Sequence, residues 1–328
     1  MNTRQHHRFI LVTSIVPLLG VCAAVVLLWN DLVGPSDLIC FAVMYVIAGL
    51  GVSTGYHRLL THRSFQTHRP IRFALIGAGA IAGQAPPIIW AAHHRRHHRV
   101  ADKPGDPHSP YDNEEPGIRG ALKGLWHAHL GWLLEKDLSS DPLRYCPDVA
   151  RDKDVRFISR YFIGFVALGV LLPALLGFAL TGTLLGAATG ALWGGLVRFF
   201  ITNHITYSVN SVGHYFGYRR FSTPDESRNV RWLALASFGE AWHNNHHAFP
   251  RSASHGMRWY EPDVSAIAIG LLERLGLAWD VQRVERSVQD ERSESRLADG
   301  MRRGSQLLPA PSTPEHDEPA SVSVGEGK

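Results

Sequence analysis

Four long apolar runs dominate the pattern of hydrophobic and polar positions. They cover residues 9–29, 38–56, 161–180 and 184–209, and only the last contains a charge, at Arg198. A bilayer core of about 30 Å needs about 20 helical residues, and core helices of soluble proteins rarely stay uncharged over that length. The pattern therefore predicts an all-α membrane protein with four transmembrane helices. The first run could instead be a signal peptide, but it is long for one and lacks a clear small-residue cleavage site.

A fifth apolar segment, residues 70–92, is flanked by histidine-rich sequences on both sides. If both flanks lie on the same side of the membrane, this segment would have to cross twice, which takes about 40 residues. We expect an interfacial or re-entrant helix that Pro86 and Pro87 break near its end. Its stretch GAGAIAG looks like a dinucleotide-binding fingerprint, but the prolines interrupt the helix that such a fingerprint needs. Close packing of small residues in a membrane explains it better.

Positive charge is distributed unevenly along the chain. Arg4 and Arg8 precede the first run, and more Lys and Arg crowd residues 57–160 and 215–260, whereas the connection 30–37 has only acidic charge and 181–183 has none. The positive-inside rule then places both termini and the long loops in the cytoplasm. The net charge of +4 fits basic loops against anionic lipid, with no nucleic-acid signature. After a membrane domain at residues 1–281, the polar, Ser- and Pro-rich residues 282–328 predict a disordered tail.

Two histidine-rich sequences, HRRHH and HNNHH, repeat one spacing. Each places histidines at i, i+3 and i+4, which project from one face of a helix. These residues are His94, His97 and His98 in the first sequence, and His243, His246 and His247 in the second. His93 lies off this face, so we do not expect it to act with the other three.

Two further sequences supply histidines at the same predicted membrane face. In HRLLTH, His57 and His62 are about 140° apart on an ideal α-helix, so they can reach one ion only if the helix unwinds. They could instead serve two ions or straddle a helix end. In NSVGH, Asn210 and His214 are one turn apart, where the fourth predicted helix leaves the membrane.

Nine histidines at one face predict a metal site. One ion cannot use nine imidazoles, so two adjacent ions with open positions are implied, and imidazole suits zinc, copper, iron and nickel alike. An open two-metal site beside lipid, without a carboxylate pair, fits oxygen chemistry on an apolar substrate better than hydrolysis. Eight other histidines are expected at polar surfaces or around the ligands: His6, His7, His68, His108, His127, His129, His204 and His255.

With these motifs the sequence resembles the integral-membrane fatty acyl desaturases of the Δ9, stearoyl-CoA desaturase type. HRLLTH, HRRHH and HNNHH match the three histidine boxes in order and spacing, and NSVGH, DPHSP, HLGWLL and GEAWHNNHHAFP extend the likeness from about residue 54 to 263. The resemblance implies four helices that span the cell inner membrane and a helical cap on its cytosolic side. It also implies a non-haem di-iron centre held by His57, His62, His94, His97, His98, His214, His243, His246 and His247, with Asn210 holding one iron through a water.

The resemblance also implies an activity and a substrate site. Such enzymes use dioxygen and two electrons to insert a cis double bond, and a bent apolar tunnel positions the acyl chain. Gln84, Trp90 and Thr206 match residues at the bend, although Trp90 would also suit an interfacial anchor. Tyr207 replaces a Trp of the relatives, which leaves the form of the bend open. Ala85 to Pro87 and Ala92 are apolar, whereas acyl-CoA enzymes have polar and charged residues that contact CoA at these positions. The acyl chain could therefore be attached to a lipid or to an acyl carrier protein instead of CoA.

The electrons are expected to come from a separate protein. The sequence has no cysteine cluster for an iron–sulfur centre, no βαβ nucleotide-binding unit and no added haem domain. A ferredoxin-, rubredoxin- or cytochrome-like carrier with an NAD(P)H reductase would supply them. A basic patch is one landing site for it, although lipid phosphate or a substrate head group would also suit these residues: Arg95, Arg96, Arg99, Arg219 and Arg220.

Three other functions are compatible with the histidine pattern. A membrane di-iron hydroxylase would use a similar site, but NSVGH and the box spacings favour a desaturase. A metal transporter would place its ligands within the membrane, whereas these lie beyond the helix ends. A structural metalloprotein would keep its metal but consume no reductant.

Overall fold

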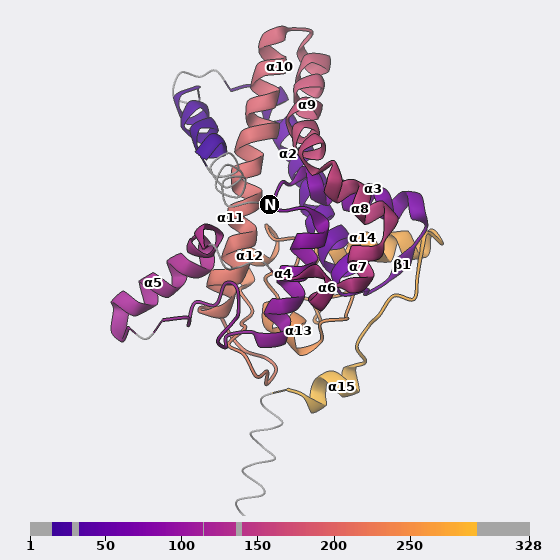
Figure 1. Cartoon of the computed structure of the whole chain (residues 1–328). Coiled ribbons are helices and arrows are strands. Elements are labelled where there is room, and N and C mark those ends of the chain that lie inside the picture. The colour runs from indigo at the N-terminus through magenta and orange to yellow at the C-terminus, as the bar shows by residue number, and fades with distance from the viewer. Residues whose placement is uncertain (1–14, 28–32, 114, 136–139, 294–328) are drawn as a thin grey trace, which may run out of the picture.

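The computed structural model describes residues 15–27, 33–113, 115–135 and 140–293, and these form an apolar helical shaft joined to a cap of short helices and loops (Figure 1). Within these described ranges, three helical stretches are long and apolar enough to cross a membrane: Pro35–Thr61, Phe162–Thr181 and Leu184–His214. They coincide with three of the predicted spans. The first predicted span, 9–29, lies partly outside the described residues, and its described part is a shorter apolar helix, Ile15–Leu27.

Two of the three spanning stretches change helix type along their length. In the first, α2 (Pro35–Leu50) continues directly into the π-helix η1 (Gly51–Thr61). In the last, α10 (Leu184–Gly190) passes through the π-helix η3 (Ala191–Val197) into α11 (Arg198–Ser211) and the 3-10 turn η4 (Val212–His214). Between them α9 (Phe162–Thr181) ends at Gly182, whose φ of 69° is a left-handed conformation that glycine adopts without strain.

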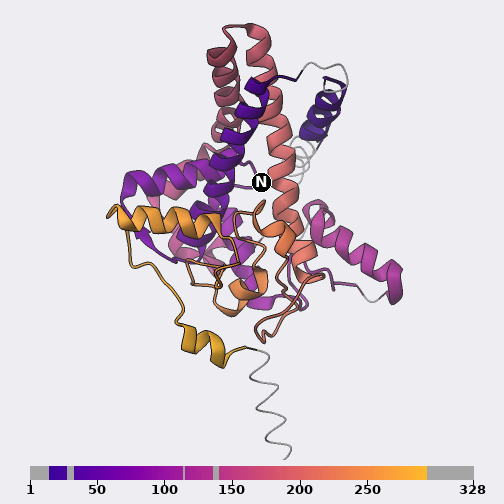
Figure 2. The ribbon, with the colours of Figure 1, turned by 180° about the vertical axis from the view of Figure 1, so that it is seen from behind.

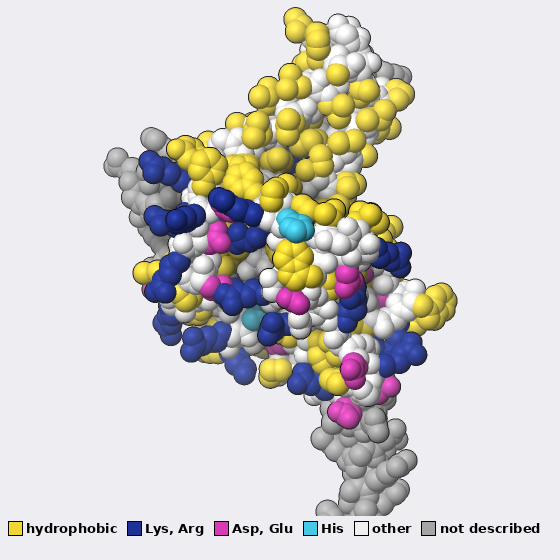
Figure 3. Space-filling model, turned by 90° about the vertical axis from the view of Figure 1, so that its right-hand side faces the viewer, with side chains coloured by type: hydrophobic (Ala, Val, Ile, Leu, Met, Phe, Trp, Pro, Cys, Tyr) yellow, Lys and Arg dark blue, Asp and Glu magenta, His cyan; other side chains and the backbone are white. Residues whose placement is uncertain are grey.

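The surface of the shaft is apolar where lipid would surround it. Leu171, Leu175 and Phe178 of α9 are exposed, and hydrophobic side chains cover this part of the molecule in Figure 3, while Lys and Arg gather on the cap. Arg198, the charge within the last apolar run, is fully buried. Its guanidinium donates to the carbonyls of Ile81 and Gly169, so backbone oxygens compensate it inside the shaft.

The segment 70–92 does not form one continuous helix. It divides into α3 (Arg69–Ile81), a turn in which Gly83 has a φ of 72°, and α4 (Pro87–Val100), where Pro87 occupies the first turn. The glycines of α3 allow close packing against η1: a Cβ on Gly79 would lie 2.5 Å from the ring of Tyr56 and 2.8 Å from the carbonyl oxygen of Gly51. Small residues therefore bring the two helices into backbone contact.

The cap surrounds the end of η1. The helices α3 and α14 lie on one side of the shaft and α5 on the other (Figures 1 and 2). The core of the cap includes Tyr56, Ile76, Val155 and Ile158, all fully buried. Its remaining elements are α5 (Gly117–His129), η2 (Gly131–Leu134), α6 (Pro142–Tyr145), α7 (Pro147–Arg151), α8 (Lys153–Arg160), α12 (Arg231–Ala234), α13 (His243–Ala248), α14 (Val264–Arg274) and the antiparallel strands β1 (Gln66–Thr67) and β2 (Ala278–Trp279).

The start of the predicted disordered tail has structure. Residues 286–291 form α15 (Arg286–Glu291), which contacts the cap because Arg220 donates to the side chain of Gln289 at 2.9 Å. Arg292 also donates to the carbonyl of Ala248 at 2.9 Å. A polar composition suggested disorder, but these side chains bond to the cap. Residues 294–328 lie outside the described part, so the boundary at 281 stays a prediction.

Candidate metal centre

The first histidine box lies on the π-helix η1, and this changes where its side chains point. A π-helix bonds residues five apart, and the amide of His62 donates to the carbonyl of His57 over 3.0 Å. Residues five apart then lie on one side of the helix, and both rings join one group. An ideal α-helix would have separated them by about 140°, so the wider turn is what allows both to approach one ion.

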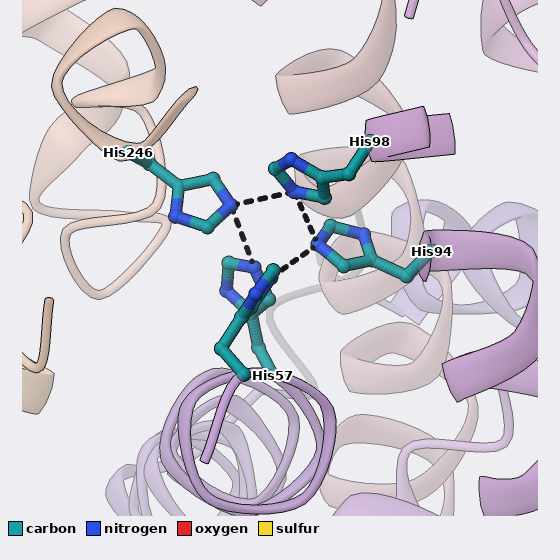
Figure 4. Close-up of side chains that lie close together, drawn as sticks. His57, His94, His98 and His246 are labelled. Atoms are coloured by element: carbon teal, nitrogen blue, oxygen red, sulfur yellow. Dashed lines mark hydrogen bonds between the residues drawn. The ribbon is translucent and has the colours of Figure 1, made fainter. Parts of the chain in front are cut away.

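Five histidine rings converge at the cap end of η1. Figure 4 labels four of them, His57, His94, His98 and His246. The Nε2 atom of His246 lies 3.1 Å from that of His57 and 2.9 Å from that of His98. His94 Nε2 lies 3.0 Å from His98 Nε2 and 2.9 Å from His62 Nε2. Two nitrogens bound at right angles about 2.1 Å from one metal would be about 3.0 Å apart, so these spacings match neighbouring ligands. We call the group cluster A: His57, His62, His94, His98 and His246.

A second group adjoins the first. His214 Nε2 lies 2.9 Å from His243 Nε2, and the ring centroid of His247 is 4.5 Å from that of His98 in cluster A. We call this group cluster B: His97, His214, His243 and His247. The sequences HRRHH and HNNHH each contribute histidines to both clusters, because neighbouring histidines on each helix reach different clusters. The structure therefore brings together all nine histidines that the sequence singled out.

Carboxylates behind cluster B fix the orientation of its rings. The Nδ1 atom of His97 lies 3.0 Å from Asp106, and that of His247 lies 3.0 Å from Asp225. A neutral imidazole carries one proton, so each ring that donates from Nδ1 presents a bare lone pair at Nε2. These two Nε2 atoms face each other at 3.3 Å. Two lone pairs at that distance repel, and a cation between them removes the conflict, so the donor set fits a metal.

At His97, burial alone would lower the pKa, but the Asp106 carboxylate outweighs it and raises the pKa. The electrostatics of the His247–Asp225 pair instead favour a neutral ligand and a charged carboxylate. Burial lowers the pKa of His247 to about 4, although Asp225 partly opposes this shift. Burial alone would raise the pKa of Asp225, but the hydrogen bond from His247 outweighs it and holds the pKa below its usual range. At neutral pH the imidazole therefore has a free lone pair for a metal, and the carboxylate is ionised behind it.

A buried ion network supports cluster A from behind. The Nδ1 atom of His57 contacts the Glu240 carboxylate. Arg58 is fully buried; its guanidinium lies 3.1 Å from Glu240 and 2.9 Å from Asp263, and it donates to the carbonyl of Ala253 at 2.8 Å. These contacts hold η1 against the loop that precedes α14.

Several residues near the clusters were not singled out from the sequence. The carboxylates are Asp102, Asp106, Asp225 and Glu240. Asp102 and Asp106 follow box two, and Glu240 precedes box three by three residues, so acidic residues close to a box are a usable signal. His108 and His255 were expected around the ligands or at the surface. Both are buried: His108 groups with His97 and Asp106, and His255 packs its ring 4.4 Å from that of His246.

An apolar pocket of about 980 Å³, counting its open mouth, runs beside both clusters. In its wall Trp90 donates its indole N–H to the Gln84 amide oxygen at 2.9 Å, and the Gln84 amide donates to Thr206 at 2.7 Å. The predicted substrate residues Gln84, Trp90, Thr206 and Tyr207 all line it, together with Asn210, His57, His94 and His243. Asn210 lines the pocket together with His243 of cluster B, and its role beside a metal stays a prediction.

Other predicted residues lie outside the two clusters. His93 lines the pocket and its Nδ1 lies 3.2 Å from the Ser140 hydroxyl. The proposed basic patch is largely engaged in ion pairs and hydrogen bonds: Arg95 with Asp148, Arg96 with the Gly105 carbonyl, Arg219 with Glu226 and Arg220 with Glu261. Arg99 is exposed. A landing surface for an electron carrier at these arginines stays a prediction.

Comparison with known proteins agrees with this geometry. The family model described as fatty acid desaturase matches residues 35–279. The chain is 41% identical over 275 residues to a hex-5-enoyl-[acyl-carrier protein] acetylenase of Moorena producens, covering 83% of this chain and 85% of that protein. It is 39% identical to an sn-1 stearoyl-lipid 9-desaturase of Anabaena variabilis, covering 74% and 83%. An acyl-CoA C20 Delta5-desaturase of Anemone leveillei is 36% identical, covering 74% and 73%.

The chain belongs to the fatty acid desaturase family, because the family model matches most of its length. The prediction of a fatty acyl desaturase, an oxidoreductase, is thereby confirmed. The names of the three relatives state three different carriers: an acyl carrier protein, a lipid and CoA. Similarity alone therefore does not choose the carrier of this chain's substrate.

Proposed function

We propose that this desaturase inserts a cis double bond at Δ9 of a saturated acyl chain, using dioxygen and two external electrons, and that clusters A and B hold two iron ions. The observation that carries the proposal is the junction of the two clusters with the apolar pocket: His57 and His94 of cluster A and His243 of cluster B are also pocket-lining residues. An acyl chain in this pocket would pass beside both clusters. Bound iron would supply the dioxygen chemistry that removes two hydrogens from an unactivated carbon pair.

The protein's own part is to position the chain. Tyr45 lines the pocket twelve residues before His57 on the continuous helix α2–η1, so the pocket extends along the shaft away from the clusters. The bonds from Trp90 to Gln84 and from Gln84 to Thr206 fix the indole beside His94, whose ring it stacks on at a centroid distance of 5.0 Å. A rigid wall at this depth selects which carbon pair lies at the clusters.

We further propose that the acyl chain is linked to a membrane lipid. The residues described along the pocket include no Lys or Arg, whereas the phosphates of CoA call for cations at the mouth. A lipid head group can remain at the membrane surface while its acyl chain enters. An acyl carrier protein substrate is the second candidate, because the relative from Moorena producens carries that term in its name.

The site is proposed to face the cytoplasm of the cell inner membrane, with both termini on the same side. A separate ferredoxin-, rubredoxin- or cytochrome-like carrier and its NAD(P)H reductase would deliver the electrons. The basis is the charge asymmetry of the loops and the lack of a second redox motif in the sequence.

Expression in a desaturase-deficient host tests the function. Gas chromatography with mass spectrometry of the membrane lipids should show a cis Δ9 alkene with the wild-type chain and none with His246→Ala. A hydroxylated product would instead support the hydroxylase. Purified protein in liposomes, supplied with a reductase and carrier, should then convert a lipid-linked chain faster than the CoA or acyl carrier protein ester. Faster turnover of either ester would reject the lipid carrier.

A further inference from the structure

Carboxylates are distributed unequally around the two clusters. In cluster B, three of the four rings have a carboxylate behind Nδ1: His97 with Asp106 at 3.0 Å, His214 with Asp102 at 2.7 Å, and His247 with Asp225. Asp106 and Asp225 are buried, and the side chain of Asp102 is 5% exposed. Within the described residues, every ion-pair partner of these aspartates is a histidine, so no Lys or Arg there neutralises them.

Cluster A has a different environment. Among the described residues, Glu240 behind His57 is the only carboxylate within ion-pair distance of its five rings. Arg58 pairs with this carboxylate at 3.1 Å, so its charge is compensated. The Nδ1 atom of His246 is buried and has no hydrogen-bond partner in the structure. Cluster A is therefore a set of largely neutral imidazoles, whereas cluster B is backed by three negative charges.

We infer that the two metal positions are electronically unequal, and that cluster B stabilises the ferric ion more strongly than cluster A does. The inference rests on the proposed di-iron function. A carboxylate that accepts the Nδ1 proton makes the imidazole a stronger donor, and nearby negative charge favours the more highly charged ion. Asp102, Asp106 and Asp225 are thus positioning residues that also tune the metal held at cluster B.

The inequality sets the order of reduction. From the diferric state, one electron from a one-electron carrier reduces the iron at cluster A and leaves cluster B ferric; a second electron gives the diferrous state. A cleft with charged residues in its wall supports this order, because His62 and His98 of cluster A line it together with Arg63, Arg95 and Arg251. Electrons arriving through this cleft would meet cluster A first.

The test is a reductive titration of the purified full-length chain loaded with ⁵⁷Fe. Iron analysis comes first: fewer than two irons per chain would reject the proposed function itself. With two irons bound, one electron per chain should give a mixed-valence electron paramagnetic resonance signal, and Mössbauer spectra should show well over half of the molecules in that state. Equal sites that do not interact would give half by chance. A tenfold preference corresponds to about 59 mV for a one-electron couple.

Matched variants assign the preference to the carboxylates. Asp225→Asn should weaken Zn²⁺ binding at one of two sites by about 10- to 100-fold and lower the mixed-valence fraction, because it weakens a ligand of cluster B. Glu240→Gln should weaken the other site and leave that fraction equal or higher. Asp225→Glu, which restores a carboxylate, should recover part of the signal. A mixed-valence fraction of one half in the wild-type chain, or an unchanged fraction in Asp225→Asn with two irons bound, would overturn the inference.

Discussion

Replacing Gln84 by Met should shift the position of the double bond, because this side chain joins Trp90 to the helix α11. Gln84 accepts the indole N–H of Trp90 at 2.9 Å and donates to Thr206 at 2.7 Å. Met has a similar volume and can make neither bond. Thr206 keeps its bond to the carbonyl of Thr202 at 3.2 Å, whereas the Trp90 donor loses its partner. An unsatisfied donor of this kind costs about 1–3 kcal/mol.

This free energy sets the expected change in products. If all of it appears as lost discrimination between neighbouring carbon pairs, the ratio of the main to the minor positional isomer falls by about 5- to 150-fold, since 1.4 kcal/mol is tenfold. The assay is mass spectrometry of dimethyl disulfide adducts from cells that express each variant at equal levels. Thr206→Val is the matched control, because it spares the Trp90–Gln84 bond and should change the ratio less. An unaltered isomer ratio in Gln84→Met, or a larger change in Thr206→Val, would refute this reasoning.

Four further predictions follow from features outside the pocket wall. Arg58→Met should destabilise the protein by about 3–5 kcal/mol, because it removes the buried guanidinium that pairs with both Asp263 and Glu240; a melting temperature in detergent equal to wild type would contradict this. Chelation of the metal should lower the melting temperature, since facing lone pairs are left uncompensated, and readdition of Fe²⁺ should restore it; a curve insensitive to chelator would argue against a bound metal. Burial would raise the pKa of Asp148, but the hydrogen bond from Arg95 outweighs it and lowers the pKa to about 2. Because the folded-state pKa is depressed, Asp148→Asn should cost about 1 kcal/mol at pH 7, and the difference should shrink as pH falls from about 4 towards 2; a constant difference would exclude this pair as its source. Impermeant labelling of engineered cysteines should reach position 35 and not position 105 from outside; the reverse pattern would overturn the topology.

The sequence predicted three of the apolar helices and the convergence of nine histidines, because both depend on local spacing. Apolar runs reveal spanning helices by length alone, and i, i+3, i+4 histidines reveal a shared face. The way each box divides between two clusters was not predictable, since His97 and His98 are neighbours in sequence yet reach different groups. That division depends on how α4 and α13 face each other after folding.

Two other features depend on contacts that local patterns do not contain. The π-helix η1 packs on α3, where a Cβ on Gly55 would lie 2.4 Å from the carbonyl oxygen of Leu75, and helical periodicity alone does not indicate so close an approach. The Asp225 carboxylate reaches His247 across 22 residues of chain. Local spacing therefore predicted histidine groups without a carboxylate pair, which agrees with clusters A and B, but it gave no sign of the carboxylates behind them.

The π-helix also constrains anyone who would build this centre into another protein. A designer who copied HRLLTH onto a straight α-helix of a bundle would turn one ring away from the ion, because the five-residue spacing only works with a five-residue backbone bond. Removing one residue between the two histidines would restore the facing geometry on a straight helix. The histidine spacing and the helix type therefore depend on each other. An insertion or deletion of one residue between the two histidines should be tolerated only if the helix type changes with it.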